Sequence, residues 1–373
     1  DVSQFRAALE AWKAPGENFV YADVDGHIGW VASARTPIRQ GWDGLLPVPG
    51  ATGAFEWQGY LASSDLPQLF DPPQHWIATA NHNILPRGYT HSIAYEWASS
   101  HRYERLREEL DTARTFSIGD FQRLQHDCTS LPGRSLQSIL RSVELPAELA
   151  PYTRLILDWD GVLSAESQAG PLYATWVQEL MRGVFDARMP QDARLDRGDL
   201  RSMTVLLHAL ENPSTPWFGD RPREARDALV RETFAAAVAR TRKLLGDETA
   251  TWSWGRLHTA TLHHPLAELG PAYAQLFNTV PVPRPGDTYT PNNTRHDERF
   301  AQIHGASYRQ IFDLAEWDRG VATSMPGQSG QAGSAHYQDL LPLWAAGEYF
   351  PLAFTRKKVE EVTQHRLALR PGP

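Results

Sequence analysis

Residues 18–33 read NFVYADVDGHIGWVAS and residues 76–83 read WIATANHN, and these two stretches decide the expected fold. In the first stretch, β-forming residues run from Phe19 to Val24, and a second apolar run extends from Ile28 to Val31. Asp25-Gly26 lies between them, and Asp-Gly between two such runs is a strong hairpin signal. We therefore predict two antiparallel strands joined by a tight turn.

The second stretch combines a short apolar run with a polar end. Trp76-Ile77-Ala78 predicts a strand, and residues 79–83 then place two carboxamides and an imidazole just beyond it. A carboxamide at the end of a strand can stay fixed and still face a cleft. We therefore expect this segment to contribute to a functional site.

Composition limits the class of protein. The 373 residues suffice for one large or two ordinary domains, and contents of 42% hydrophobic and 21% charged residues are normal for a globular protein. The formal net charge of -8 argues against a nucleic-acid-binding protein, which should carry a basic face. We find no apolar run long enough to span a bilayer and no secretory signal at the start.

Helical patterns dominate the middle of the chain. Ser117 to Asp120 is typical of a capping box, so a helix should begin there. Apolar residues at helical spacing predict a longer helix from about Gln168 to Arg188, and another that starts near Pro222 and stops at Gly246. Residues 281–293 and 326–333 are rich in Pro and Gly and predict loops.

Eight segments follow one another along the chain in an order that identifies a family. They are NFVYADVDGHIGW (18–30), PIRQGWDGLLPVPG (37–50), FEWQGYL (55–61), IATAN (77–81), HGASYR (304–309), PGQSGQ (326–331), HY (336–337) and LWAAGEYFPL (343–352). Together they resemble the penicillin acylase (penicillin amidase) family. The matches cover nearly the whole chain, so they are far more specific than any single short motif.

The resemblance implies an N-terminal nucleophile hydrolase of the α+β class, part of an αββα sandwich with a helical middle region. Such an enzyme is made as a precursor that cuts itself, so that a Ser becomes the first residue of the β chain. The Ser Oγ attacks the substrate amide, and its own α-amino group is the base. An α-amine titrates near ~7.7–8.0, close to the working pH, which suits that task.

The sequence departs from the family at the nucleophile. It begins Asp1-Val2-Ser3, Asp has no hydroxyl, and the family's segment around the nucleophile is not recognisable. The resemblance is therefore to the later part of the β chain. The expected partners are an α chain and an N-terminal β segment carrying the nucleophilic Ser, together with a small-molecule amide substrate. We expect no nucleic-acid partner and no membrane span.

We divide the chain into three regions on this basis. Residues 1–97 form a strand-rich part of the hydrolase core that includes the oxyanion loop, residues 98–256 are mainly helical, and residues 257–373 are a strand-rich part that returns to the core.

Three residues are predicted to act in the site through the resemblance. An Asn in the position of Asn81 donates its side-chain N–H to the oxyanion that forms during attack, although a lone Asn would more simply satisfy a turn. Arg102 falls where the family has an Arg that holds the nucleophile's amine and this Asn; otherwise it is a solvated arginine at a helix start. Glu17 borders the family's acyl pocket or faces solvent. His82 is expected at the rim, because the α-amine already serves as base.

The resemblance implies no cofactor for the chemistry. The family often binds structural Ca²⁺ through oxygen ligands from both chains, and Gly44 could supply one carbonyl here. The expected Asp in the loop after Asn81 is not evident, which argues against structural calcium here.

Three other patterns have competing interpretations. Residues 155–162, LILDWDGV, resemble the strand and DxDG motif of haloacid-dehalogenase-type phosphatases, but the acylase family also carries W-D-G at this place. The spacing of His258, His263 and His264 fits no common zinc pattern and favours structural histidines. Cys128, the only cysteine, is predicted to be a small buried hydrophobe in a helix rather than a nucleophile.

The predicted reaction is hydrolysis of an amide between a hydrophobic acyl group and an amine, through an acyl-enzyme on a Ser outside this chain. Within the class, the alternative is an acylase for acyl-homoserine lactones or other lipid-like amides. From another class, the alternative is a noncatalytic binding module on the same scaffold. The resemblance implies a periplasmic or secreted protein, and the isolated chain is expected to be inactive because it lacks the nucleophile.

Overall fold

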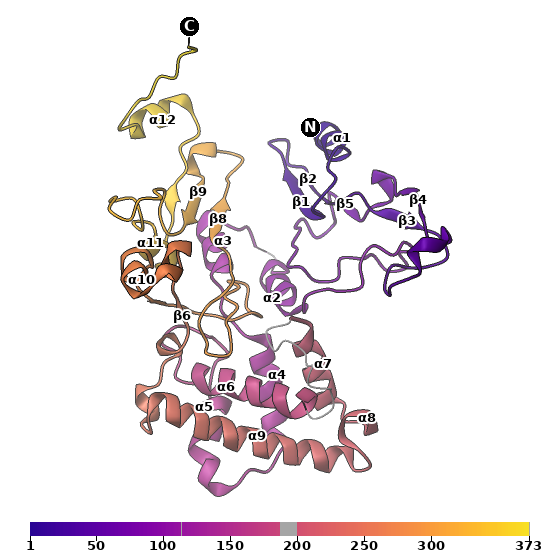
Figure 1. Cartoon of the computed structure of the whole chain (residues 1–373), viewed down its shortest axis with the longest axis vertical. Helices are drawn as coiled ribbons and strands as arrows, with labels where there is room; N and C mark the ends of the chain where they lie inside the picture. Colours follow the sequence, from indigo (N-terminus) through magenta and orange to yellow (C-terminus); the bar gives the residue numbers. More distant parts are fainter. Residues whose placement is uncertain (113, 187–199, 373) are drawn as a thin grey trace. The chain divides into compact units, whose positions relative to one another are not determined.

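The computed structural model describes residues 1–112, 114–186 and 200–372 (Figure 1). The chain forms two compact units. The first comprises Asp1–Ala113 and Asp199–Ala209, and the second comprises Arg114–Gly198 and Leu210–Pro373. Both contain helices and strands, so the fold is mixed, as predicted. Within the described ranges, no helix is long and apolar enough to cross a membrane.

The first unit is built on the predicted hairpin. Strands β1 (Glu17–Ala22) and β2 (Ile28–Ser33) pair antiparallel, with Phe19 opposite Val31. The Asp23 carboxylate accepts hydrogen bonds from the Asp25 and His27 backbone N–H groups, and Gly26 adopts φ 93°, which closes the turn at low steric cost. The hairpin prediction is therefore confirmed.

Further short elements complete the first unit. Strand β5 (Gln68–Phe70) extends the sheet in the order β1-β2-β5, and β3 (Pro37–Arg39) pairs with β4 (Trp57–Tyr60) in a separate ribbon. The helical elements are α1 (Val2–Leu9), η1 (Gly50–Thr52), η2 (Ser63–Asp65), α2 (His101–Leu110) and most of α7 (Leu200–Glu211).

The strand predicted at Trp76-Ile77-Ala78 is wrong. These residues are irregular, and none of the described strands pairs with them. An apolar run alone does not make a strand, because a strand also needs a partner that completes its ladder of backbone hydrogen bonds. The polar segment that follows therefore continues a loop.

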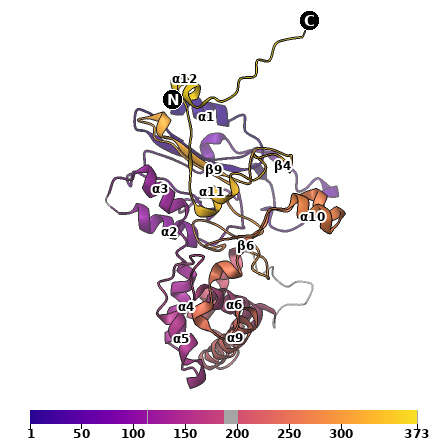
Figure 2. The same ribbon diagram turned by 90° about the vertical axis from the view of Figure 1, so that its left-hand side faces the viewer.

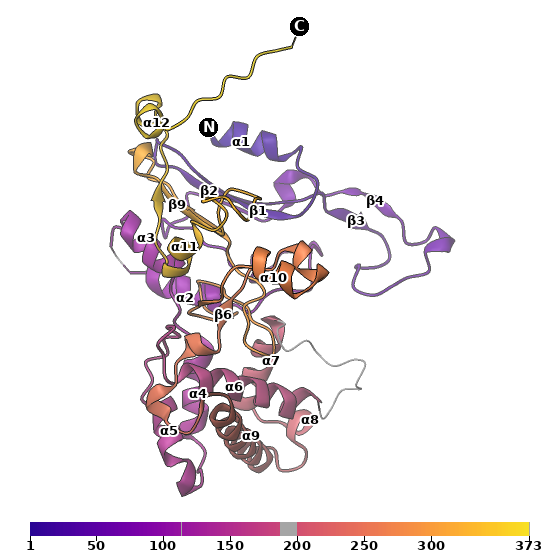
Figure 3. The same cartoon turned by 60° about the vertical axis from the view of Figure 1, so that its left-hand side comes forward.

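Helices dominate the first half of the second unit. They are α3 (Ile118–Gln125), α4 (Leu131–Arg141), η3 (Ala147–Leu149), α5 (Ala150–Leu157), α6 (Gly170–Met181), the π-helical η4 (Arg182–Asp186), α8 (Thr215–Phe218), α9 (Pro222–Leu245), η6 (Thr249–Thr251) and η7 (Trp254–Arg256). Figures 2 and 3 show α6 and α9 running beside one another. Trp176 of α6 packs edge-on against Phe234 of α9 with ring centroids 5.2 Å apart, and both are fully buried. This pair anchors the helical core.

The helix predictions agree well with these elements. Ser117 caps α3 in a reciprocal capping box with Asp120, and α9 begins at Pro222 and ends before Gly246, as predicted. The helix predicted from Gln168 begins at Gly170 and continues through η4 to Asp186, and its predicted last two residues lie outside the described residues.

The second half of this unit returns to short strands. A three-stranded antiparallel sheet has the order β10-β9-β8, formed by β8 (Tyr308–Ile311), β9 (Val321–Ser324) and β10 (Phe350–Pro351). β6 (Thr259–Ala260) pairs with β7 (Val282–Pro283), so the predicted loop 281–293 contains one two-residue strand. The remaining elements are η8 (Pro265–Leu269), α10 (Pro271–Phe277), η9 (Trp317–Arg319), α11 (Leu341–Ala346) and α12 (Arg356–Val362). Residues 326–333 contain no helix or strand, as predicted.

The described elements between residues 98 and 256 are all helical, whereas strands lie on either side. The boundaries of the three predicted regions stay a prediction, since the two compact units divide the chain by contacts and not by secondary structure.

Candidate active site

The backbone at Asn81 has an unusual conformation. Asn81 has φ 60°, in the left-handed region that few residues other than Gly adopt, and Asn is among those that tolerate it. The Asn81 carbonyl accepts a hydrogen bond of 2.9 Å from the Ala98 backbone N–H, and the preceding Ala80 is buried. The loop is thus tied down on both sides of an exposed carboxamide.

Arg102 orients that carboxamide. It lies in the first turn of α2, only 8% exposed, and its Nη2 donates a hydrogen bond of 2.9 Å to Asn81 Oδ1. A guanidinium only donates, so the carbonyl oxygen of Asn81 must face it. Both hydrogens on Asn81 Nδ2 then point away from Arg102 and can meet another acceptor. The structure therefore brings together the two residues predicted to act in one site.

The charge on Arg102 also affects its surroundings. Burial lowers the pKa of Arg102 from its ordinary 12.5, but a guanidinium remains charged at neutral pH. A fixed positive charge behind the carboxamide polarises it, because Oδ1 accepts a charge-assisted hydrogen bond. The N–H groups of Asn81 become better donors toward a developing negative charge, which is the task of an oxyanion donor.

An apolar cavity of about 260 Å³ lies in the same unit, and the two residues that follow Asn81 are part of its lining. Its lining consists mainly of aromatic and aliphatic side chains, namely Trp30, Leu69, Gln74, Trp76, Ile77, Ala78, Thr79, His82, Asn83, Ile84, Leu85 and Tyr103. Small-molecule sites are commonly concave and apolar with few polar groups. This cavity suits a hydrophobic group of modest size.

His82 forms part of this wall. Its ring stacks on Tyr103 with centroids 3.7 Å apart and planes 11° apart. Burial, with a smaller contribution from the charge of Arg102, lowers the pKa of His82, so the imidazole stays neutral at neutral pH. Its place in the lining is compatible with the predicted rim position, and its role stays a prediction.

Sequence patterns alone did not identify Trp30 and Tyr103 as lining residues. Trp30 lies on β2, and its indole N–H donates to Asn18 Oδ1, which holds the ring in place. Tyr103 directly follows Arg102 on α2, and that adjacency was the available signal. Glu17, in contrast, is exposed at the first position of β1 and does not line this cavity. A role for Glu17 in substrate choice stays a prediction.

The surroundings of Gly44, whose carbonyl was considered as one calcium ligand, do not suit a cation. A Cβ built on Gly44 would lie 2.7 Å from Arg39 Nε, so the guanidinium of Arg39 occupies the space beside it. A positive charge there disfavours Ca²⁺, and no group of three or more His, Cys, Asp or Glu in the described ranges could hold a metal ion. These residues do not form a calcium site by themselves, and no step of the chemistry is assigned to calcium.

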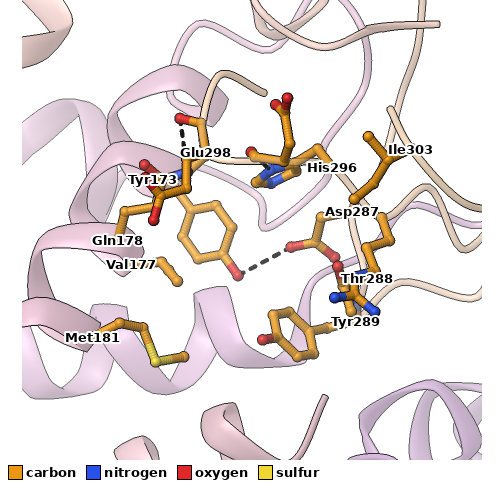
Figure 4. A pocket seen from close by; sticks show the side chains of 13 residues that line it. Tyr173, Val177, Gln178, Met181, Asp287, Thr288, Tyr289, His296, Glu298 and Ile303 are labelled. Carbon is orange, nitrogen blue, oxygen red and sulfur yellow. Dashed lines mark hydrogen bonds between the residues drawn. The ribbon is translucent and has the colours of Figure 1, made fainter. Parts of the chain in front are cut away.

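A second cavity, of about 180 Å³, lies in the second unit between α6 and residues 287–303 (Figure 4). The Tyr173 hydroxyl donates to Asp287 Oδ2 at 3.3 Å, and Ser130 Oγ donates to the Tyr173 hydroxyl at 3.0 Å. Burial raises the pKa of the Asp287 carboxyl to about 6. The hydrogen bonds are internal to the protein, so this arrangement supports the core.

The competing patterns have structural explanations. Residues 155–157 end helix α5, so the DxDG sequence does not follow a strand as a phosphatase nucleophile would. The His258 Nδ1 contacts the Phe300 carbonyl oxygen at 2.9 Å, and His264 caps η8, so the histidines serve different local structures.

Cys128 was predicted in a helix, and that is wrong: it lies between α3 and α4, where its carbonyl accepts from the Leu163 N–H. Burial raises the pKa of its thiol to about 12. The thiol is therefore protonated at neutral pH and is not a nucleophile.

Comparisons with known proteins identify the family of the chain. The chain matches the penicillin amidase family over residues 1–361. It is 28% identical to the acyl-homoserine lactone acylase QuiP of Pseudomonas aeruginosa, covering 100% of this chain and 49% of that protein. It is likewise 28% identical to the penicillin acylase 2 proenzyme of a Pseudomonas species, covering 98% of this chain and 48% of that protein.

A solved structure shows the same fold. The thermostable penicillin G acylase from Alcaligenes faecalis superposes with a TM-score of 0.69 at 21% identity, covering 100% of this chain and 70% of that one. The chain thus has the fold of an N-terminal nucleophile hydrolase, and it spans about half the length of the curated relatives it matches. Because the family match covers nearly its whole length, the chain belongs to the penicillin amidase family.

Proposed function

We propose that this chain is the β-chain portion of an amidohydrolase that cleaves an amide between a hydrophobic acyl group and an amine. The observation that carries the proposal is the hydrogen bond from Arg102 Nη2 to Asn81 Oδ1, which leaves the Asn81 N–H groups free to donate. The attacking Ser lies outside this chain, on an N-terminal β segment that assembles with an α chain. Its α-amine is the base, and an acyl-enzyme is the intermediate.

In this mechanism Asn81 stabilises the negative charge that develops on the carbonyl oxygen of the substrate. Attack on the amide carbonyl converts its oxygen into an oxyanion, and a positioned N–H stabilises that oxygen more in the transition state than in the substrate. Arg102 acts through Asn81 by holding its carboxamide. The cavity lined by Trp30, Trp76 and Tyr103 supplies the apolar surface that an acyl group would bury.

The acyl group can be aromatic or long and aliphatic, and both have support. Relatives carry the names penicillin acylase and acyl-homoserine lactone acylase, so the second candidate substrate is an acyl-homoserine lactone or another lipid-like amide. The cavity of about 260 Å³ is large enough for a phenylacetyl group, and its aromatic side chains Trp30, Trp76 and Tyr103 suit an aromatic ring. We therefore place phenylacetyl-type amides first. The family is typically periplasmic, and we propose that location here.

A direct test compares two preparations on the same amides. The isolated chain should give no turnover of a chromogenic phenylacetyl amide above a heat-denatured control, because it has no nucleophile. The whole protein, with its Ser-starting segment, should turn over that amide and, more slowly, a long-chain acyl-homoserine lactone. Turnover by the isolated chain would contradict the assignment of the nucleophile to another segment.

Mass analysis separates an enzyme from a noncatalytic binding module. The whole protein is mixed with an activated phenylacetyl ester and quenched with acid, and its chains are weighed. An enzyme gains one acyl group on the chain that begins with Ser, whereas a binding module retains its original masses. Unchanged masses together with absent turnover would favour the binding module.

A further inference from the structure

His82, the residue after Asn81, contacts the backbone on the other side of Asn81. A residue other than Gly in the left-handed region, such as Asn81 at φ 60°, stays there only where neighbouring contacts hold it. One such contact spans the residue, because the Ala80 backbone N–H donates to His82 Nδ1 at 3.4 Å. The side chain of His82 therefore closes a small ring of atoms around the strained residue.

The His82 ring also joins this loop to helix α2. It stacks face to face on the Tyr103 ring, with centroids 3.7 Å apart and planes 11° apart. Tyr103 directly follows Arg102, whose guanidinium holds the Asn81 carboxamide. All of these residues belong to the first compact unit. His82 thus links the loop to the same helix turn that orients Asn81.

The imidazole has the protonation state that these contacts need. Nδ1 of His82 accepts the Ala80 N–H, so the single ring proton lies on Nε2. Burial, and then the charge of Arg102, lowers the pKa of His82, so Nδ1 keeps its lone pair at neutral pH. A neutral ring also avoids placing a second positive charge beside Arg102.

Asn81 is therefore held in three ways. Its backbone carbonyl accepts the Ala98 N–H at 2.9 Å, and its side-chain oxygen accepts from Arg102 at 2.9 Å. These two contacts fix the two oxygens of Asn81, whereas the contacts of His82 restrain the backbone turn that carries them. The turn helps to set the direction in which the hydrogens on Asn81 Nδ2 point.

A second interpretation is that the His82 ring serves only as a wall of the apolar cavity, which it also lines. A wall needs apolar surface alone, and Ile84 and Leu85 of the same lining provide it without a ring nitrogen. A wall requires neither an acceptor for the Ala80 N–H nor a parallel stack on Tyr103. These two contacts favour a positioning role for His82.

We propose that His82 is a positioning residue for the oxyanion donor: through Ala80 and Tyr103 it keeps the Asn81 carboxamide aimed at the developing oxyanion. This role rests on the proposed amide hydrolysis and adds a residue to it. His82 acts through Asn81, and it transfers no proton and makes no bond to the substrate carbonyl. Its contribution should therefore appear in the rate of acylation at saturating substrate.

The test is a double-mutant cycle on the whole protein, in which the acylation rate is measured at saturating activated phenylacetyl ester. His82→Ala removes a neutral hydrogen bond and an aromatic contact together and should slow acylation about 5- to 100-fold. In the Asn81→Ala background the same change should alter the rate by less than about twofold, because no carboxamide is left to position.

Two conservative variants separate the contacts. His82→Asn keeps an acceptor attached to Cγ and loses the ring, whereas His82→Phe keeps the ring and loses the acceptor. Each should slow acylation about 2- to 10-fold, less than His82→Ala does. Thermal unfolding shows which variants are folded, and these two decide the question if His82→Ala is not.

The matched control is His91→Ala. His91 is exposed, its ring contacts the Tyr89 ring edge-on with centroids 5.5 Å apart, and it does not line the cavity. Its removal also deletes an imidazole and an aromatic contact, but at a place away from Asn81. The control variant should acylate at the rate of the unmodified protein.

The possible outcomes point to different conclusions. Equal effects of His82→Ala in both backgrounds would show that the ring acts as a cavity wall and would overturn the positioning role. An unchanged rate in His82→Ala, with Asn81→Ala still slow, would also overturn it and leave the proposed hydrolysis intact. Acylation that Asn81→Ala itself does not slow would instead contradict the proposed function, and the role of His82 would fail with it.

Discussion

Replacing Arg102 with Met tests whether this arginine positions Asn81. The change removes the 2.9 Å hydrogen bond to Asn81 Oδ1 and keeps an apolar stem of similar length. A hydrogen bond to a charged group is worth about 1.5–3 kcal/mol. At about 1.4 kcal/mol per tenfold in rate, complete loss of that positioning lowers kcat about 10- to 150-fold. The KM should change by less than about threefold, because the apolar cavity is unaltered.

The assay is steady-state hydrolysis of the best phenylacetyl amide by the whole protein. Arg107→Met is the matched control, since Arg107 is an exposed arginine on the same helix α2. Thermal unfolding is measured in parallel. Asn81 is exposed and can bond to water, so the melting temperature of the Arg102 variant should fall little. A kcat within twofold of the Arg107 variant would refute the positioning role.

Two predictions concern the second unit. The pKa of Asp287 is raised from 3.8 to about 6, so the folded state binds a proton more tightly than the unfolded state, and this carboxyl makes the protein less stable as pH rises from 4 to 6. Urea titrations at each pH give the free energy of unfolding of the unmodified protein and of Asp287→Asn. The difference between the two should fall by about 3 kcal/mol from pH 4 to pH 6. A difference that does not change with pH would contradict a buried carboxyl that binds a proton in this range. A Cβ on Gly133 of α4 would lie 2.7 Å from the Trp159 ring, so Gly133→Ala should lower the free energy of unfolding by about 1–3 kcal/mol. In the control Gly119→Ala the nearest atoms are 3.7 Å from the Cβ, so the stability should not change. Equal stability of the two variants would contradict the predicted clash and show that the ring moves freely.

Local signals in the sequence predicted the local structure well. The Asp25-Gly26 turn and the caps at Ser117 and Gly246 depend on residues within a few positions of each other, and the structure contains all three. The strand predicted at Trp76 failed because pairing is decided by segments far away in the sequence. Apolar content alone does not reveal whether such a partner is present.

Only part of the site could be predicted, because its contacts also join residues that are far apart in the sequence. The resemblance indicated Asn81 and Arg102, and the structure adds the hydrogen bond between residues that are 21 positions apart.

The most direct test of the proposed mechanism is the acylation rate of the whole protein carrying Asn81→Ala. Single-turnover mixing with an activated phenylacetyl ester measures formation of the acyl-enzyme on the Ser-starting chain. Loss of one oxyanion donor should slow this step about 10²- to 10³-fold, with ester binding and thermal stability unchanged. Acylation at the rate of the unmodified protein would remove Asn81 from the mechanism and contradict the account.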